Sequence, residues 1–371
     1  MKQEEIKQHS PGPDAGKDRM KKILLITLAV LLAAVLGIVC VWNLLLNRLG
    51  DSEKTVETLS QEELDAILGT TVPVETSPED TWPVVVSDEN ITNIMLVGQN
   101  WREDEQNKLS DTMILCSINK ETKTITLTSF LRDLYIQLPN YKGKICGENR
   151  INVCYNLGYK WAGDLGGMEM LDLLILNNFG VEVDYNVEID FYALLALVNK
   201  LGGVTIDLDA DEAKYLTDSL HCQGSFVEGE NLILGDTALA YARMRKANAG
   251  DSDINRTARQ RKLITQIIKQ CMSMSLSELN DVLTYILPMI LTDMNEEEIM
   301  DLAMIAIGML TDLKIESNMC PAPGTYWGDI VNIGGYDSGV IKCNVFANKE
   351  RLMAIAENGM SVAELDAAAE E

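Results

Sequence analysis

The stretch DTMILCSINKETKTITLTSF, residues 111–130, contains two runs that are typical of β-strands. Residues 111–119 are mainly apolar, and residues 122–130 alternate between polar and apolar side chains. A similar run, NIMLVG, precedes them at 93–98. The sequence therefore predicts that the folded part of the chain begins near Asn93 with a β-sheet.

Helix-like and strand-like segments alternate after this point. Residues 167–180 and 191–203 have helical spacing and end in glycine, whereas residues 185–190 and 204–209 resemble strands. Such alternation predicts a layered α/β fold. The rest of the chain predicts, in order, a helix after residue 253, two more helices at 276–312, a β-hairpin at 319–346 and a frayed acidic tail at 357–371.

The N-terminal 90 residues predict a membrane anchor. Residues 1–22 form a polar tail, residues 23–46 an uncharged and almost wholly apolar segment, and residues 47–89 an acidic, Pro-containing stalk. An apolar run of this length spans a bilayer, and the lysines and arginine just before it favour a cytoplasmic N-terminus. A single-pass protein of the cell membrane is expected, with its main domain outside the cell. A cleaved signal peptide and a buried core helix are the alternatives.

The charge of the chain excludes several classes of function. The sequence has 31 Lys and Arg against 56 Asp and Glu, a net charge of −25, so a surface that binds nucleic acid is not expected. Its two histidines, His9 in the polar tail and His221 in a predicted loop, give no support to histidine-based catalysis. A few converging arginines could still bind an anion.

The eight cysteines do not form a zinc motif, because no CxxC pair occurs. Cys40 lies in the apolar segment, and Cys116 and Cys271 are interpreted as small buried hydrophobic residues. An extracellular domain permits disulfides among the remaining cysteines. We expect one between Cys320 and Cys343.

Arginines are concentrated in two places. Arg132 and Asp133 are adjacent in TSFLRDLYIQLPNY, residues 128–141, where a strand would be apolar. Residues 241–262 contain the second group, Arg243, Arg245, Arg256, Arg259 and Arg261. Guanidinium groups donate paired hydrogen bonds that match phosphate oxygens, so their convergence predicts a pyrophosphate site. The alternatives are an ion pair between Arg132 and a neighbouring carboxylate, and a solvated, ion-paired helix surface at 241–262.

Other polar residues extend this hypothesis. Asp111 stands at the entry of a strand, where it either caps a turn or binds a metal; a carboxylate beside phosphates can hold Mg²⁺. Arg150 and Asn152 add a cation and an amide before a loop. No P-loop, GxGxxG, GxSxG or HExxH pattern is present, so the common ATPase, dehydrogenase, hydrolase and metalloprotease motifs are absent.

The order of these motifs between residues 92 and 265 resembles the LytR–CpsA–Psr family of cell-wall glycopolymer transferases. The resemblance rests on NIMLVGQN (93–100), LSDTMILCSIN (109–119), TITLTSFLRDLYIQLP (124–139), NRINVCYNLGY (149–159), GDTALAYARMRK (235–246) and DSDINRTARQR (251–261). It implies a three-layer α-β-α sandwich with a central mixed sheet and a deep apolar groove for a polyprenyl chain. The helices at 168–178 and 191–201 are expected to form the groove walls. The catalytic domain would cover residues 90–275, with the segment 276–356 packed on it.

The resemblance also implies a reaction. A glycopolymer would pass from a polyprenyl-pyrophosphate carrier to peptidoglycan, forming a phosphodiester and releasing polyprenyl phosphate. Asp111 matches the family's metal-binding aspartate, with Mg²⁺ expected and Mn²⁺ as a second choice. The phosphate contacts correspond to Arg132, Arg150, Asn152, Arg243, Arg245, Arg256 and Gln260. Arg132 and Asp133 match the catalytic Arg-Asp pair, and Asp253 would orient an arginine or deprotonate the acceptor hydroxyl.

The sequence departs from the family pattern at several positions. Asn100 replaces a metal-binding aspartate, so the metal site loses one charge unless Asp104 supplies it. Leu109, Leu131 and Asn255 replace an arginine, a proline and a glycine. Two other functions remain as alternatives: hydrolysis of the same lipid-linked precursor by water, and a non-catalytic scaffold or regulator that binds the lipid.

Overall fold

The computed structural model describes residues 88–99, 108–245, 252–295 and 312–370, and between 296 and 311 the positions 297, 298, 301, 302, 305 and 309. The predicted cytoplasmic tail at 1–22, the apolar segment at 23–46 and nearly all of the stalk at 47–89 lie outside the described residues. Within the described ranges, no helix is both long enough and apolar enough to cross a membrane.

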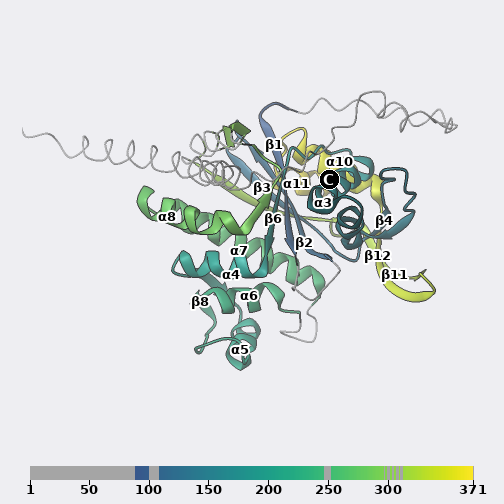
Figure 1. Ribbon diagram of the computed structural model, residues 1–371. Helices are drawn as coiled ribbons and strands as arrows, with labels where there is room; N and C mark the ends of the chain where they lie inside the picture. Colours follow the sequence, from purple (N-terminus) through teal and green to yellow (C-terminus); the bar gives the residue numbers. More distant parts are fainter. Residues whose placement is uncertain are drawn as a thin grey trace, which may run out of the picture.

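A six-stranded mixed sheet lies at the centre of the fold (Figure 1). Its strands in spatial order are β10 (Lys314–Cys320), β3 (Thr124–Phe130), β2 (Ser110–Asn119), β1 (Ile91–Gln99), β6 (Tyr185–Asp190) and β9 (Ile290–Thr292). The β1–β6 and β10–β3 pairs are parallel, and the other three pairs are antiparallel. The predicted mixed sheet is thus confirmed.

The other elements surround this sheet. Three small two-stranded sheets are made of β4 (Tyr135–Gln137) with β5 (Glu148–Arg150), β7 (Val204–Leu208) with β8 (Gly229–Ile233), and β11 (Tyr326–Ile333) with β12 (Tyr336–Cys343). The helices are η1 (Ile151–Val153), α3 (Cys154–Phe179), α4 (Phe191–Lys200), α5 (Ala210–Asp218), α6 (Gly235–Arg243), α7 (Asp253–Ser273), α8 (Leu276–Ile286), η2 (Leu287–Met289), α10 (Val345–Ala356) and α11 (Val362–Glu370).

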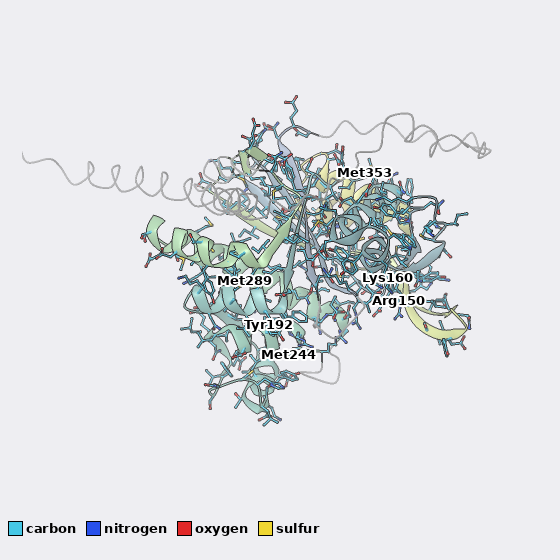
Figure 2. The ribbon with its side chains drawn as sticks, viewed as in Figure 1. Arg150, Lys160, Tyr192, Met244, Met289 and Met353 are labelled. Atoms are coloured by element: carbon cyan, nitrogen blue, oxygen red, sulfur yellow. The ribbon has the colours of Figure 1, made fainter. Side chains whose placement is uncertain are left out.

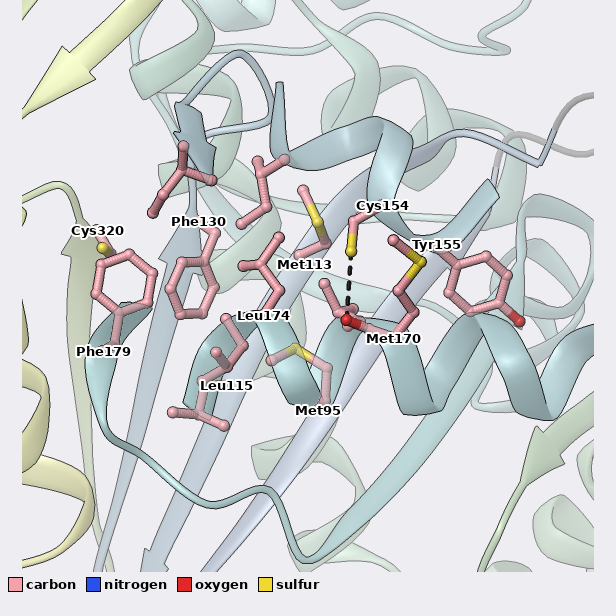
Figure 3. Packing of buried hydrophobic residues seen from close by; sticks show 14 of the residues in the cluster. Met95, Met113, Leu115, Phe130, Cys154, Tyr155, Met170, Leu174, Phe179 and Cys320 are labelled. Atoms are coloured by element: carbon pink, nitrogen blue, oxygen red, sulfur yellow. Dashed lines mark hydrogen bonds between the residues drawn. The ribbon is translucent and has the colours of Figure 1, made fainter. Parts of the chain in front are cut away.

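Alternating strand residues place hydrophobic clusters on both faces of the sheet. On one face, Met95 and Met113 pack against Met170 and Leu174 of α3 (Figure 3). On the opposite face, a second set that includes Ile94, Ile114 and Leu127 packs against α7. Because successive strand side chains point to opposite faces, this arrangement follows from apolar strands that are covered on both sides.

Helix α3 is bent back on itself by small residues. Ala162 and Gly163 have non-helical dihedral angles, with φ of 72° at Gly163, so the helix turns a corner there. The two arms approach so closely that a Cβ on Gly158 would lie 2.0 Å from the carbonyl oxygen of Gly166. The later arm ends at Gly180 in the left-handed conformation, the predicted glycine stop.

A separate hydrophobic cluster joins the helices that follow the sheet. Residues of α4, α6 and α7 pack with Val204 and Ile206 of β7. The strand-like pattern at 204–209 therefore does form a strand, but it pairs with β8 rather than with the central sheet.

The C-terminal segment corrects one prediction. Its hairpin is present as β11–β12. The tail at 357–371 was expected to be frayed, and this is wrong for most of it, because residues 362–370 form α11. The backbone N of Val362 donates to Glu316 Oε2 (2.7 Å), and Arg351 Nη2 lies 2.7 Å from Asp366 Oδ1. These contacts hold α11 against β10 and α10.

A second prediction, the disulfide between two cysteines, is also wrong. Cys320 and Cys343 are both free thiols, so the disulfide expected between them is absent. Burial raises the pKa of Cys343 to about 11 and also raises the pKa of Cys320 well above its usual value. Cys116 is buried, as expected for a small apolar residue, and Cys154 donates to the Met170 carbonyl oxygen (Figure 3).

Candidate active site

A cavity of about 770 Å³ opens between the sheet and helices α4, α6 and α7. We call it the arginine pocket. Its polar lining consists of Asp111, Arg132, Arg243, Arg245, Arg256 and Gln260, together with Asp190 and Thr112. Along α7 the lining residues change from Arg256 and Gln260 to Leu263, Ile264 and Ile267. The pocket therefore passes from a cationic region to an apolar one within three turns of a single helix.

The apolar walls come from two of the hydrophobic clusters. Leu194 and Leu197 of α4, with Ile267, pack against the cluster of α4, α6 and α7. Leu96 and Ile264 pack against the cluster on the sheet. Of the two helices expected as groove walls, 191–201 does line the pocket. The prediction is wrong for 168–178, because this part of α3 covers the other face of the sheet.

Arg132 is the centre of the polar region. It lies in the turn after β3, two residues beyond the strand, and its side chain is 22% exposed. Its guanidinium nitrogens lie 3.3 Å from Asp111 Oδ1, 3.4 Å from Asp133 Oδ2 and 3.4 Å from Asp253 Oδ1. Burial alone lowers the pKa of Arg132, but the carboxylates of Asp133, Asp253 and Asp111 more than offset this, so the pKa is raised.

Asp253 joins Arg132 to Arg256. It is the first residue of α7, where a carboxylate complements the helix dipole, and its Oδ1 lies 2.9 Å from Arg256 Nη2. Arg256 is only 2% exposed, and its Nη2 also donates to the Asp111 carbonyl oxygen (3.2 Å). Burial raises the pKa of Asp253 and lowers that of Arg256. Asp253 thus fixes two arginines that face one pocket.

Two further arginines come from the end of α6. Arg243 lies 4.8 Å from the ring centroid of Phe191, which positions its guanidinium at the start of α4. Arg245 follows two residues later and also lines the pocket. Gln260 donates from Nε2 to the Ala242 carbonyl oxygen (3.3 Å), and its buried Oε1 has no hydrogen-bond partner. An unpaired buried oxygen facing a cavity is suited to a ligand donor.

Arg150 and Asn152 lie behind this pocket rather than on its lining. Arg150 Nη1 lies 3.4 Å from Asp133 Oδ1, so Asp133 separates it from Arg132. Asn152 is buried in η1; its backbone N donates to the Arg132 carbonyl oxygen (3.3 Å), and its Oδ1 has no hydrogen-bond partner. Both residues therefore support the turn that carries Arg132 and Asp133.

Arg259 and Arg261, which belong to the same sequence group, point elsewhere. Arg259 Nε lies 2.7 Å from Glu212 Oε1, and both side chains are buried. Arg261 Nε donates to Ser317 Oγ at 2.5 Å. The alternative of an ion-paired helix is therefore correct for Arg259, in a buried rather than a solvated form.

Of the two residues predicted to bind magnesium, only Asp111 is among the described residues. Asn100 and Asp104 lie outside them, and within the described part of the chain no three His, Cys, Asp or Glu side chains are grouped as a metal site. Mg²⁺ bound with a phosphate substrate needs only one or two protein carboxylates. Asp111 fits this pattern, because its side chain is 19% exposed, lines the pocket and lies beside Arg132.

One protein-family model matches most of this chain. The family model described as the LytR_cpsA_psr family covers residues 51–337. The chain belongs to this family. The matched range includes every residue that lines the arginine pocket.

Named relatives give this membership a context. Biofilm regulatory protein A of Streptococcus mutans serotype c is 28% identical over 206 residues, which are 54% of this chain and 49% of that protein. The polyisoprenyl-teichoic acid–peptidoglycan teichoic acid transferase TagU of Bacillus mycoides is 27% identical over 218 residues, 58% of this chain and 65% of that protein. The chain thus matches about half to two thirds of the length of these LytR_cpsA_psr relatives.

Solved structures show the same fold. B. subtilis TagV has a TM-score of 0.55 at 21% identity, covering 72% of this chain and 97% of that one. The LytR-CPS2A-psr family protein YwtF (TagT) with bound octaprenyl pyrophosphate lipid has a TM-score of 0.51 at 20% identity, covering 72% and 91%.

Some residues of this LytR_cpsA_psr site had no signal in the sequence. Phe191, which supports Arg243, looked like an ordinary first residue of an apolar helix. The sequence also gave no sign that the hairpin lies beside Asp133. The two are brought together by a bridge from Leu134 to Ile341, which are far apart in the chain.

Proposed function

We propose that this chain transfers a glycopolymer from a polyprenyl-pyrophosphate carrier to peptidoglycan. The observation that supports this most is the arginine pocket, which combines four arginines with an apolar wall in one cavity. A pyrophosphate matches the guanidinium groups, and a polyprenyl chain matches the apolar wall. The names of the TagU relative and of the lipid-bound TagT structure are consistent with such a substrate.

The arginines would act mainly on the transition state. The bond that breaks joins the phosphorus carrying the glycopolymer to the bridging oxygen of the pyrophosphate. As it breaks, negative charge grows on the departing polyprenyl phosphate. Arg132, Arg243 and Arg256 are held by carboxylates, a ring and backbone, so little reorganisation is needed to stabilise that charge. The proton of the attacking hydroxyl needs an acceptor. Asp253 and Asp133 are each engaged by two arginines, Asp253 by Arg132 and Arg256 and Asp133 by Arg132 and Arg150. Asp253 does not line the arginine pocket and is suited to orienting its arginines, whereas Asp133 is the more exposed carboxylate, at 24% against 17%, and is better placed to accept the proton.

We also propose Mg²⁺ as the cofactor, with Mn²⁺ as a substitute. Asp111 would hold it together with substrate phosphate oxygens and, from outside the described residues, Asn100. Mg²⁺ at this position would neutralise part of the charge of the leaving group. Because an amide contributes no charge, Asn100→Asp is expected to lower the Mg²⁺ concentration needed for half-maximal binding of octaprenyl pyrophosphate. The measurement is a lipid-binding titration at a series of Mg²⁺ concentrations, with Asp111→Asn expected to shift the curve the opposite way.

The site must also reach a lipid in a membrane. We propose that residues 23–46 anchor the chain, with the N-terminus in the cytoplasm and the α/β domain outside the cell. The experiment is protease treatment of intact cells: an external domain is cleaved without lysis, whereas protection until lysis would contradict this orientation.

The decisive experiment follows both products. The full-length chain is incubated with a polyprenyl-pyrophosphate-linked glycan, peptidoglycan fragments and Mg²⁺, and polyprenyl phosphate and glycan-linked peptidoglycan are measured. We expect both to form. Arg132→Ala should reduce the rate about 100- to 1000-fold, the range for one lost electrostatic contact to a transition state. Lys269→Ala removes an exposed positive charge from the far part of the same helix as Arg256. Lys269 does not line the pocket, so this variant should have little effect.

Other outcomes identify the alternatives. Polyprenyl phosphate together with free glycan, even at saturating acceptor, would establish a hydrolase. Tight lipid binding that depends on Arg132 without any turnover would establish a scaffold or regulator.

A further inference from the structure

A second cavity of about 390 Å³ lies between Asp133 and the β11–β12 hairpin. We call it the hairpin groove. Its hairpin lining consists of Gly328, Asp329, Ile330, Gly339, Val340 and Ile341. The hairpin extends away from the body of the protein in Figure 1, and Arg150, labelled in Figure 2, belongs to the small sheet at its base.

The groove adjoins the arginine pocket through two consecutive residues. Arg132 lines the pocket, Asp133 lines the groove, and Arg132 Nε lies 3.4 Å from Asp133 Oδ2. The hairpin is fixed to this turn, because Ile341 N donates to the Asp133 carbonyl oxygen (2.9 Å) and Leu134 forms a bridge with Ile341. A molecule in the groove would therefore lie next to whatever the arginines hold.

The chemistry of the groove differs from that of the pocket. Its described lining includes no Lys, Arg or His, and the carboxylate that it offers is that of Asp133. Asp329 alternates with Gly328 and Ile330, so its side chain lies on the other face of the hairpin, where its Oδ2 pairs with Lys342 Nζ (2.8 Å). A hydroxyl group of a neutral ligand could donate to the Asp133 carboxylate, which is 24% exposed beside Arg132 and Arg150. Ile330, 71% exposed, offers an apolar surface to the flat face of a ring. This combination of one acceptor carboxylate with exposed apolar area suits a sugar.

Two glycines leave the backbone of the hairpin groove accessible to a ligand. In the antiparallel register Gly328 lies opposite Ile341, and Gly339 lies opposite Ile330, so all four residues share one face of the hairpin. A Cβ on either glycine would meet no atom within 4 Å. Neither glycine has a positive φ, so neither is required by the backbone conformation. Glycine within a strand is typical of places where a ligand approaches the backbone closely.

We propose that the hairpin groove binds the acceptor glycan and presents its hydroxyl to the phosphorus held in the arginine pocket. This inference rests on the proposed transferase function and adds the acceptor site to it. The hydroxyl oxygen forms a bond to the phosphorus that carries the glycopolymer. The bond from that phosphorus to the bridging oxygen breaks, and its electron pair leaves with polyprenyl phosphate. The hydroxyl proton passes to the carboxylate of Asp133.

The test separates acceptor binding from donor binding. The full-length chain is titrated with a peptidoglycan-derived tetrasaccharide and, separately, with octaprenyl pyrophosphate, each by calorimetry. Gly339→Leu and Gly328→Leu fill the groove without a backbone clash, and leucine suits a strand better than glycine. Each should weaken tetrasaccharide binding at least tenfold and leave the affinity for octaprenyl pyrophosphate unchanged. Ser338→Leu, beside Gly339 but on the opposite face of the hairpin, is the matched control and should change neither affinity.

Each result has a distinct meaning. Tetrasaccharide binding that survives both glycine substitutions, or is absent from the wild type while octaprenyl pyrophosphate binds, would overturn the acceptor site and leave the donor site standing. Loss of both affinities in Ser338→Leu as well as in the glycine variants would show that hairpin folding, not groove contact, is responsible, and would also overturn it. Failure of octaprenyl pyrophosphate to bind the wild type would overturn the proposed function itself.

Discussion

At the scale of single residues, arginines and aspartates of the site form ion pairs with one another. Arg132, Arg150 and Arg256 are matched by Asp111, Asp133 and Asp253 through ion pairs of 2.9–3.4 Å. Pairing reduces the free-energy cost of removing these groups from water. An incoming anion must compete with the carboxylates for the same guanidinium groups. The site therefore favours a ligand that carries more charge than one carboxylate, such as a pyrophosphate.

The buried pair of Arg259 and Glu212 gives a prediction of stability. Glu212→Gln keeps the capping-box contacts with Asp209, which glutamine can also make, but removes the negative charge 2.7 Å from Arg259. Breaking a buried ion pair leaves a charge without its counter-ion, so unfolding free energy should fall by about 3 kcal/mol. Urea denaturation measures this. Asp218→Asn, exposed on the same helix, should stay within about 0.5 kcal/mol of the wild type, and an equal loss in both variants would contradict the explanation.

At the scale of elements, α7 organises the site. Arg256, Gln260, Leu263 and Ile267 follow one another along its pocket side, whereas Arg259 and Arg261 reach Glu212 and Ser317 in other directions. One helix thereby contributes to the cationic region, the apolar wall and two separate buried contacts. Its first residue, Asp253, ties the helix start to Arg132 in the turn after β3.

The corner in α3 gives a second prediction. Alanine usually stabilises a helix relative to glycine by roughly 0.5–1 kcal/mol. At Gly158 the sign should reverse, because the new Cβ would lie 2.0 Å from a backbone oxygen of the other arm. Gly158→Ala should lower the unfolding free energy by about 1–3 kcal/mol, the usual cost of overpacking. Gly328→Ala, where a Cβ meets nothing, is the control for the same denaturation experiment. An unchanged or higher stability of Gly158→Ala would show that the two arms can separate freely.

These elements also show what a sequence reveals. The strands at 93–98, 111–119 and 122–130 were predictable, because their hydrophobic pattern is set by burial on both faces of a sheet. Helix α11 was not, since its Ala- and Glu-rich sequence lacks an apolar stripe and it is held by Glu316 and Arg351 from distant parts of the chain. The concentration of arginines in the sequence was enough to predict a site for an anion. Residue chemistry alone did not separate Arg256 from Arg259, which lie three residues apart and differ in their long-range partners. The family resemblance did name Arg132, Arg243, Arg245, Arg256 and Gln260, which line the pocket, but it also named Arg150 and Asn152, which do not.

At the scale of the whole molecule, a net charge of −25 is combined with buried carboxyls. Burial raises the pKa of Asp172 from 3.8 to about 7, and burial raises that of Glu357 from 4.5 to about 7. A carboxyl whose pKa is higher in the folded state binds more protons folded than unfolded. Its contribution to stability is complete below the unfolded pKa and is lost as the pH rises through 7.

Stability should therefore decline as the pH rises from about 4.5 to about 7.5. A fall of a few kcal/mol in unfolding free energy is expected, because one pKa unit corresponds to about 1.4 kcal/mol. The measurement is urea denaturation across this range. Asp172→Asn and Glu357→Gln should each flatten the curve, and Asp218→Asn should follow the wild type. A curve that rises with pH in the wild type would contradict the assignment.

Two hydrophobic clusters form the apolar walls of the arginine pocket. Leu197 and Ile267 pack against one cluster, and Leu96 and Ile264 pack against the other. A prenyl chain lying there would touch both and act as a removable piece of the protein interior. Folding and occupancy are then thermodynamically linked, and a ligand that binds only the native state at 100 times its Kd adds about 2.7 kcal/mol. When the product leaves the pocket, this addition to the free energy of unfolding would be lost. On the proposed function, scarcity of the lipid would therefore leave more of the protein in its less stable, empty form.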